Sequence, residues 1–546
     1  MSLLIFTYSV KKFILISTEK EMKVKIFDST LRDGAQGGGI AFTVEDKIRI
    51  VKQLDRFGID YAEAGNPGSN RKDIEFFRRV SGLNLKHIRL TAFGSTCKKG
   101  TSAADDPQLK ALLEAETPAV AVFGKAWNLH VTKVLQTTLE ENLRMVTDTV
   151  AFLKAAGREV IFDAEHFFDG YKADAAYAVK VCACAAAAGA DVVVLCDTNG
   201  GAMPDEIAEA VKAAVGVAGS AEIGIHAHND GGLAVANSLT AVAAGAVHVQ
   251  GTFNGFGERC GNANLSSIIP NLQLKKGYEC IPPENMVLLT ETSRVINEIA
   301  NLLPDSRAPF VGRSAFAHKA GMHIDGVTKL SGSFEHIDPA VIGNTRRFLM
   351  SDQAGRSLLL TKLRKIDAGL QKDSPVVGEI LERLKQAEAE GYVYEDAEAS
   401  FEILARKTMG LYRPFFHLKH FKVSIDEPRL EGKYSAAAMV KIEVDGADEI
   451  GAAEGDGPVN ALDKALRRVL TVFYPEIRNI FLNDYKVRVI DDREATAARV
   501  RVLIRTSDGK HTWTTVGVSQ DIIEASWLAL VDSVEYKLLK EQLSHH

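Results

Sequence analysis

The sequence predicts a TIM (β/α)8 barrel, followed by a helical region and a C-terminal α+β domain. Apolar runs typical of strands alternate with helical periodicity about eight times within roughly 250 residues, which is the size of such a barrel. Polar side chains follow most of the predicted strands, as expected where the carboxyl ends of several strands form one site. An open, doubly wound sheet is the alternative fold. The number of units and the polar strand ends favour a closed barrel.

The barrel elements are assigned from apolar runs and from amphipathic periodicity. The expected strands are residues 24–27, 59–64, 87–93, 119–123, 159–163, 191–196, 222–226 and 246–252. The expected helices are residues 43–57, 73–80, 108–114, 139–156, 173–188, 205–215, 233–244 and 264–275.

The whole chain divides into four segments. We expect an N-terminal extension at residues 1–22, the barrel at 23–277, helical linker subdomains at 278–400 and an α+β domain at 401–546. The last segment contains a weak internal repeat, in which two strands, a glycine and a helix follow one another twice. The strands and helix of the two copies are residues 434–444, 451–457 and 459–472, then 497–506, 512–518 and 522–538.

Composition excludes several classes of function. Hydrophobic residues make up 46% of the chain and charged residues 25%, which is typical of a globular protein. The formal net charge is −6 and no basic block is present, which argues against a nucleic-acid partner. The apolar run near the N-terminus is interrupted by Lys11 and Lys12 and is too short to span a membrane. The six cysteines show no C-x-x-C spacing, so we expect reduced thiols and a cytoplasmic location.

His226 and His228 stand at the end of a predicted strand. Residues i and i+2 of a strand project from the same face, so both imidazoles would point the same way and chelate a cation. Hydrogen-bonded structural histidines are the alternative. Asp33, after the first strand, is the candidate anionic ligand, with a loop or N-cap carboxylate as the alternative. Two histidines and one carboxylate leave positions open and accept zinc, manganese or magnesium. Arg32 beside Asp33 would place a cation where an oxyanion develops, with a surface or barrel-rim ion pair as the alternative.

Three segments resemble the signatures of a known family. They are residues 28–34 (DSTLRDG), 226–230 (HAHND) and 255–265 (GFGERCGNANL). They are similar to those of the 2-isopropylmalate, homocitrate and citramalate synthases, within a wider group of metal-dependent barrels that includes hydroxymethylglutaryl-CoA lyase. Residues 32–37 (RDGAQG) and 65–70 (GNPGSN) look most like the longer bacterial citramalate synthases. The resemblance extends from about residue 23 to the C-terminus.

The resemblance implies a divalent metal centre. Its ligands would be Asp33, His226 and His228, with Asn262 as a further ligand or as a hydrogen-bonding partner of the ligands. The cation would bind a 2-oxo acid through its carboxylate and carbonyl oxygens, and would polarise the carbonyl.

The resemblance also implies roles for side chains that do not bind the metal. Arg32 would stabilise the developing alkoxide or enolate, Thr198 would bind the substrate carboxylate, and Glu165 would orient substrate or assist proton transfer. His323 matches the family's catalytic base, which acts on acetyl-CoA at the barrel of a partner subunit. The chain departs from the family at Phe334, where relatives commonly carry a tyrosine. That difference puts in doubt the role of the tyrosine hydroxyl here.

The activity implied is that of an acyltransferase that condenses acetyl-CoA with pyruvate to (R)-citramalate and CoA, the first step of the pyruvate route to isoleucine. The C-terminal domain would bind a branched-chain amino acid, with isoleucine as the expected inhibitor, in a homodimer; a purely dimerising domain is the alternative. The other oxo acids of the family, 2-oxoisovalerate and 2-oxoglutarate, are the alternative substrates. A lyase and a non-catalytic amino-acid sensor are more distant alternatives.

Overall fold

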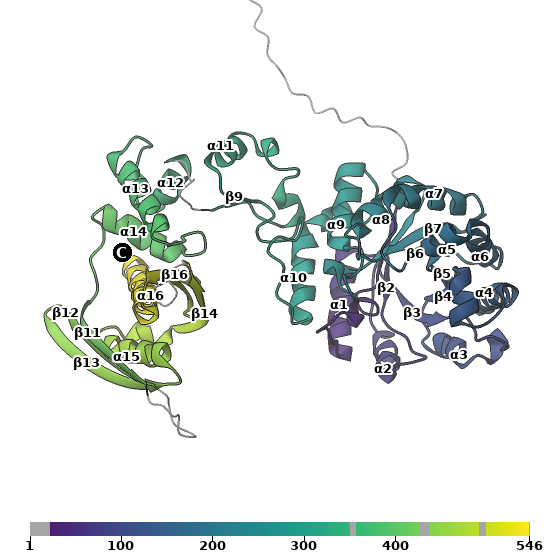
Figure 1. Cartoon of the computed structure of the whole chain (residues 1–546), viewed down its shortest axis with the longest axis horizontal. Helices are drawn as coiled ribbons and strands as arrows, with labels where there is room; N and C mark the ends of the chain where they lie inside the picture. Colours follow the sequence, from purple (N-terminus) through teal and green to yellow (C-terminus); the bar gives the residue numbers. More distant parts are fainter. Residues whose placement is uncertain (1–21, 350–355, 426–435, 491–497, 545–546) are drawn as a thin grey trace, which may run out of the picture. The chain divides into compact units, whose positions relative to one another are not determined.

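The computed structural model describes residues 22–349, 356–425, 436–490 and 498–544 (Figure 1). The predicted N-terminal extension therefore lies outside the described residues, apart from Met22. The chain forms two compact units. The first comprises Met1–Phe316 with Ile337–Thr345, and the second comprises Ala317–His336 with Arg346–His546.

Eight parallel strands of the first unit close into a barrel, which confirms the predicted fold class (Figure 1). The strands are β1 (Lys25–Asp28), β2 (Tyr61–Glu63), β3 (Arg89–Ser95), β4 (Ala119–Lys125), β5 (Glu159–Glu165), β6 (Val192–Asp197), β7 (Glu222–Ala227) and β8 (His248–Gly251). Closure is visible in the register of β1, where Phe27 pairs with Tyr61 of β2 on one side and with Gln250 of β8 on the other.

Helices alternate with the barrel strands. They are α1 (Val44–Phe57), α2 (Arg71–Val80), α3 (Pro107–Glu114), α4 (Leu139–Ala155), α5 (Phe167–Ala173), α6 (Ala175–Ala187), α7 (Pro204–Val215), α8 (Ala234–Ala243) and α9 (Leu265–Pro270), and α10 (Leu289–Ile299) follows the barrel. The predicted helix 264–275 is divided, because α9 ends at Pro270 and a π-helical turn, Asn271–Lys275, continues it. Proline has no N–H to donate to the preceding turn, which accounts for the break.

The first helix shows how the sequence sets the ends of these elements. The Thr43 hydroxyl accepts from the Asp46 N–H, while the Asp46 carboxylate accepts from the Thr43 N–H, which forms a capping box. The helix ends at Gly58, whose φ of 96° is left-handed. A Cβ there would lie 2.5 Å from Cδ of Pro282, so glycine is required on steric grounds as well.

The interior of the barrel is packed rather than hollow. Inward-facing side chains of several strands form one buried cluster: Phe27, Tyr61, Ala119, Ala121, Ile161, Val192, Val194 and Cys196. The His248 ring is also buried, and it packs against the rings of Phe27 and Tyr61. A filled interior leaves the carboxyl ends of the strands as the place for a site.

The second unit begins with a helical part. Two short parallel strands, β9 (Ala317–His318) and β10 (Arg347–Phe348), pair with each other. Four helices share this part of the unit with them: α11 (Gly321–Lys329), α12 (Arg356–Leu363), α13 (Pro375–Ala389) and α14 (Glu398–Thr408).

The C-terminal part contains the predicted repeat, but each copy has three strands rather than two. The first copy is β11 (His417–Ile425), β12 (Ala436–Val444), β13 (Ala447–Gly455) and α15 (Pro458–Phe473); the second is β14 (Phe481–Val489), β15 (Val500–Ser507), β16 (Thr512–Ser519) and α16 (Ile522–Ser544). Strands β11 and β14 are edge strands whose side chains are mostly exposed. They therefore lack the apolar alternation from which β12 was predicted. Among the described residues, no helix is long and apolar enough to cross a membrane.

Candidate metal and catalytic site

A cavity of about 240 Å³ opens at the carboxyl ends of the barrel strands. Five strands or the loops that follow them supply the polar residues around it, so the site depends on closure of the barrel. The lining residues include Arg32, Asp33, Phe93, Phe123, Asp163, Glu165, Thr198, His226, His228 and Arg259.

Asp33, His226 and His228 converge within this cavity. His226 Nε2 lies 3.3 Å from Asp33 Oδ2 and 3.3 Å from His228 Nε2, and His228 Nε2 lies 3.8 Å from the same carboxylate oxygen. All three side chains are buried, and their ligand atoms lie within 4.8 Å of one another. Two imidazole nitrogens and one carboxylate oxygen at this spacing are a donor set that suits a divalent cation.

The electrostatics of the three groups favour cation binding over protonation of the carboxylate. Burial alone would raise the pKa of Asp33, but the Arg32 guanidinium and the two histidines outweigh it and hold that pKa well below its usual range. Burial, reinforced by His226, lowers the pKa of His228 to about 4. Burial also disfavours charge on His226, yet its hydrogen bond to Asp33 and the Asp33 charge raise the pKa of His226. An ionised carboxylate and a neutral His228 are the forms that bind metal.

Asn262, the fourth predicted ligand, is joined to the cluster through its backbone but is not among the residues that line the cavity. Its backbone pairs with that of His228, its Nδ2 donates to the carbonyl of Phe256 at 3.0 Å, and its buried Oδ1 has no partner among the described residues. Gly257 makes room for this amide, because a Cβ there would lie 2.2 Å from Asn262 Nδ2. A buried carbonyl oxygen without a donor is costly, and a bound cation or its water would satisfy it.

Arg32 is fixed at the cavity by contacts on two sides. Its Nε donates to Glu63 Oε2 at 2.7 Å, and its guanidinium carbon lies 3.8 Å from the centre of the Phe93 ring. A guanidinium held by a buried carboxylate and an aromatic face is pre-organised, and Arg32 lines the cavity with its Nη1 3.6 Å from Asp33 Oδ2. Ser29 Oγ donates to the same oxygen of Glu63.

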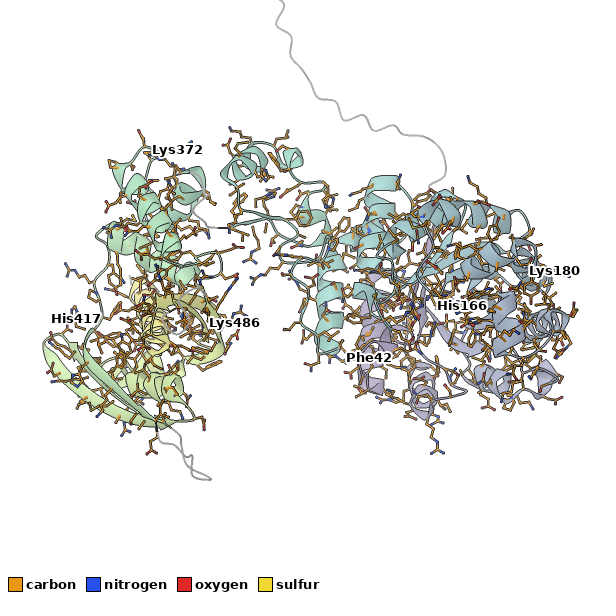
Figure 2. All side chains as sticks on the ribbon, in the orientation of Figure 1. Phe42, His166, Lys180, Lys372, His417 and Lys486 are labelled. Carbon is orange, nitrogen blue, oxygen red and sulfur yellow. The ribbon has the colours of Figure 1, made fainter. Side chains whose placement is uncertain are left out.

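Thr198 and Glu165 occupy neighbouring strand ends. The Thr198 hydroxyl oxygen accepts from the backbone N–H of His166 at 2.9 Å, which leaves the hydroxyl proton available to a substrate. His166, labelled in Figure 2, has a left-handed φ of 56° directly after β5. Glu165 pairs with Lys125 of β4, a partner that the sequence motifs did not indicate.

His323 lies in the second unit, whereas the cavity lies in the first. It is an exposed residue of α11, and its ring stacks on Phe334. Six of the predicted residues line one cavity: Arg32, Asp33, Glu165, Thr198, His226 and His228. The predicted base, His323, belongs to the other unit.

Sequence reasoning gave no role to several residues of the site. Gln250 lies inside β8 between Val249 and Gly251, and Lys125 ends β4, so neither belongs to a polar cluster in the sequence. Phe93 and Phe123 form a stacked pair at the cavity, with ring centres 5.5 Å apart. Among these residues, Asp163 could have been assigned to the site from the sequence, because it precedes Glu165 by two positions and so shares its face of β5.

Comparison with known proteins places this site in a family. The model of the HMGL-like family matches residues 23–296. The model described as homocitrate synthase post-HMGL domain-like matches residues 310–391, and that of the LeuA allosteric (dimerisation) domain matches residues 395–538. The (R)-citramalate synthase of Aquifex aeolicus is 50% identical over 95% of this chain and 98% of its own length. The chain belongs to the citramalate synthases of the HMGL-like family.

Other members of the family differ in their sequence identity to this chain. The (R)-citramalate synthase of Geobacter sulfurreducens is 49% identical over 95% of this chain and 98% of its own. The 2-isopropylmalate synthase of Pyrococcus furiosus is 31% identical over 94% of this chain and 98% of its own. The match to citramalate synthases thus covers the barrel, the helical part and the C-terminal repeat alike.

Proposed function

We propose that this chain condenses acetyl-CoA with pyruvate to give (R)-citramalate and free CoA. The full-length match to citramalate synthases carries the proposal, together with the cluster of Asp33, His226 and His228 beside Arg32. The chain is an acyltransferase that uses acetyl-CoA, and the 2-isopropylmalate synthases are more distant relatives.

A divalent cation fits the donor set of the barrel mouth. Asp33, His226 and His228 would hold it, and the free Oδ1 of Asn262 would add an oxygen ligand directly or through water. When bound, such an ion supplies Lewis-acid polarisation of the 2-oxo carbonyl. Zinc, manganese and magnesium all suit two imidazoles and a carboxylate with open positions.

The protein groups supply positioning and charge. Arg32, held by Glu63 and Phe93, places a cation beside the carbonyl oxygen as it becomes an alkoxide. The free hydroxyl proton of Thr198 donates to the substrate carboxylate. Glu165, paired with Lys125, lies at the same mouth and orients the acetyl group or assists its deprotonation.

The reaction balances in three steps. A base removes a proton from the acetyl methyl group, and the resulting enolate carbon forms the new C–C bond at the pyruvate carbonyl carbon. The carbonyl oxygen becomes an alkoxide and takes up a proton. Water then cleaves the thioester of the citramalyl-CoA, and CoA leaves as the thiol. Base catalysis by an imidazole suits the first step near neutral pH.

Aromatic side chains at the cavity are consistent with a small oxo acid. The stacked rings of Phe93 and Phe123 both line the cavity and form bulky apolar walls. A methyl group is the substituent that such an aromatic wall accommodates with least displacement. This supports pyruvate over the alternative oxo acids.

We place the base at His323 of a second copy of this chain, in a homodimer. Two findings support this: the imidazole is exposed on α11, and the C-terminal part matches a dimerisation domain. That domain would also bind the effector, with isoleucine as the inhibitor, as expected for an enzyme of isoleucine biosynthesis. All six cysteines are free, which supports the cytoplasmic location.

Product analysis tests the proposed reaction. The enzyme is incubated with pyruvate and acetyl-CoA labelled with carbon-13 in the methyl group, and the products are separated on a chiral column. We expect labelled (R)-citramalate and CoA in equal amounts. Labelled 2-isopropylmalate from 2-oxoisovalerate, without citramalate from pyruvate, would overturn the proposed substrate.

A further inference from the structure

Gln250 connects a candidate metal ligand to an acidic side chain of the barrel mouth. His226 Nδ1 lies 3.0 Å from Gln250 Oε1, and Gln250 Nε2 lies 3.0 Å from Asp163 Oδ1. The three residues come from β7, β8 and β5, so their hydrogen bonds span the mouth from one strand to another across the barrel. Both Gln250 and Asp163 are buried, at 0% and 4% exposure, so solvent does not stand in for either hydrogen bond.

The carboxylate of Asp163 sets the direction of both hydrogen bonds. An ionised carboxylate only accepts hydrogen bonds, so Asp163 accepts one from the NH2 group of Gln250. The amide oxygen of Gln250 is then directed toward His226. An amide oxygen also only accepts, so His226 carries its proton on Nδ1. With Nδ1 committed to Gln250, Nε2 is the nitrogen of His226 that a cation would bind in place of the hydrogen bond to Asp33.

We propose that Asp163 and Gln250 are positioning residues that fix the tautomer and ring orientation of His226 for cation binding. The proposal rests on the metal site of the proposed function and extends it to two residues that touch neither cation nor substrate in that scheme. With the amide of Gln250 reversed, the proton of His226 would move to Nε2. The cluster would then present an N–H donor in place of a ligand.

A donor–acceptor exchange tests this assignment separately from packing. Gln250→Met keeps the length of the side chain and removes both hydrogen bonds. The double variant Asp163→Asn with Gln250→Glu restores them in exchanged form, because the new carboxylate accepts from His226 Nδ1 and from the new amide. Gln273→Met is the matched control, because that glutamine hydrogen-bonds the backbone of Cys280 and Ile281, in the segment after α9.

The measurement is the affinity of the chelator-stripped full chain for Mn²⁺, by competition with a chromophoric chelator at pH 8. Burial, with the charge of Glu63, raises the pKa of Asp163, and an alkaline buffer therefore favours its ionised form. We expect Gln250→Met to weaken binding by about 10- to 100-fold, the usual effect of losing the partner of a ligating histidine. The double variant should return to within about threefold of wild type, and the control should not change.

Two results would overturn the proposal. One is a Gln250→Met variant that binds Mn²⁺ as tightly as wild type; the other is a double variant that unfolds cooperatively yet binds no better than Gln250→Met. A wild-type chain without affinity for Mn²⁺, Zn²⁺ or Mg²⁺ would instead contradict the metal site of the proposed function. Because no oxo acid enters the assay, an error in the assigned substrate leaves its outcome unaffected.

Discussion

The imidazole of His323 stacks on the ring of Phe334, with ring centres 4.4 Å apart and 26° between the planes. The phenylalanine lies against Gly326, where a Cβ would meet Cε2 of the Phe334 ring at 2.4 Å. The ring thus fits between α11 and the following turn and holds one face of the proposed base. Packing against the imidazole is a role that phenylalanine fills without the hydroxyl that relatives commonly carry at this position.

The stacked pair predicts a graded response to substitution. Phe334→Tyr keeps the aromatic face, so we expect kcat to stay within about twofold of wild type. Phe334→Ala frees the imidazole and should lower kcat about fivefold, the equivalent of an aromatic contact worth about 1 kcal/mol. Steady-state CoA release measures both. Phe481→Ala, at an exposed aromatic residue of β14, is the control. Full activity of Phe334→Ala would show that the stack has no part in catalysis.

The metal cluster predicts loss of both cation and turnover on substitution. Asp33→Ala and His226→Ala each remove a ligand from the buried set and should lower kcat by at least about 1,000-fold. Bound metal, measured by elemental analysis after gel filtration, should fall in parallel. Asp367→Ala, at an exposed aspartate of the second unit, should change neither value. Near wild-type turnover of either ligand variant would contradict the assignment.

A site shared between two copies predicts complementation. Asp33→Ala lacks a working barrel and His323→Ala lacks the base, so each homodimer should be inactive. Co-expressed with different affinity tags, the two chains form mixed dimers with one intact site, and statistical pairing should restore about a quarter of wild-type activity. If barrel and base of the same chain work together, every site contains a defect. A mixture as inactive as its parents would therefore contradict the shared site.

A buried acid in the C-terminal part predicts a pH dependence of stability. Glu535 is buried and accepts from the backbone N–H of Phe415, and burial raises its pKa to about 7. The folded state therefore binds more protons than the unfolded state between about pH 4 and 7, so stability falls as pH rises through this range. Glu535→Gln should flatten that slope and raise the unfolding free energy by about 1–3 kcal/mol at pH 8.

Fluorescence separates the stability of this unit from that of the barrel. The second unit contains Trp513 and Trp527, and the first contains Trp127, the third tryptophan of the chain. Urea unfolding in a Trp127→Phe background reports the second unit alone, at pH 5 and at pH 8. An unchanged difference between the two pH values in Glu535→Gln would show that another group causes the slope.

The barrel could be predicted from the sequence because its strands are buried on both faces. Runs such as that around Ile161 or Val194 are continuously apolar, and helical periodicity separates them. The edge strands β11 and β14 could not be predicted in this way, since most of their side chains face solvent. Their assignment depends on pairing with β12 and β15.

Only part of the candidate site could be predicted from the sequence. Asp33 and the two histidines stand in short polar motifs next to apolar strands, which is why local reading found them. The link from Gln250 to Asp163 joins residues 87 positions apart, and only closure and register of the barrel bring their side chains together. No local pattern in the sequence marks Gln250 as a partner of a residue on another strand.

The most direct test compares four oxo acids in parallel. CoA release from acetyl-CoA is followed by thiol titration with pyruvate, 2-oxobutyrate, 2-oxoisovalerate or 2-oxoglutarate, before and after removal of metal with a chelator, and after its return. We predict the highest kcat/KM with pyruvate, loss of activity on chelation and recovery on adding a divalent cation. Chelator-resistant activity, or a preference for 2-oxoisovalerate or 2-oxoglutarate, would contradict the account.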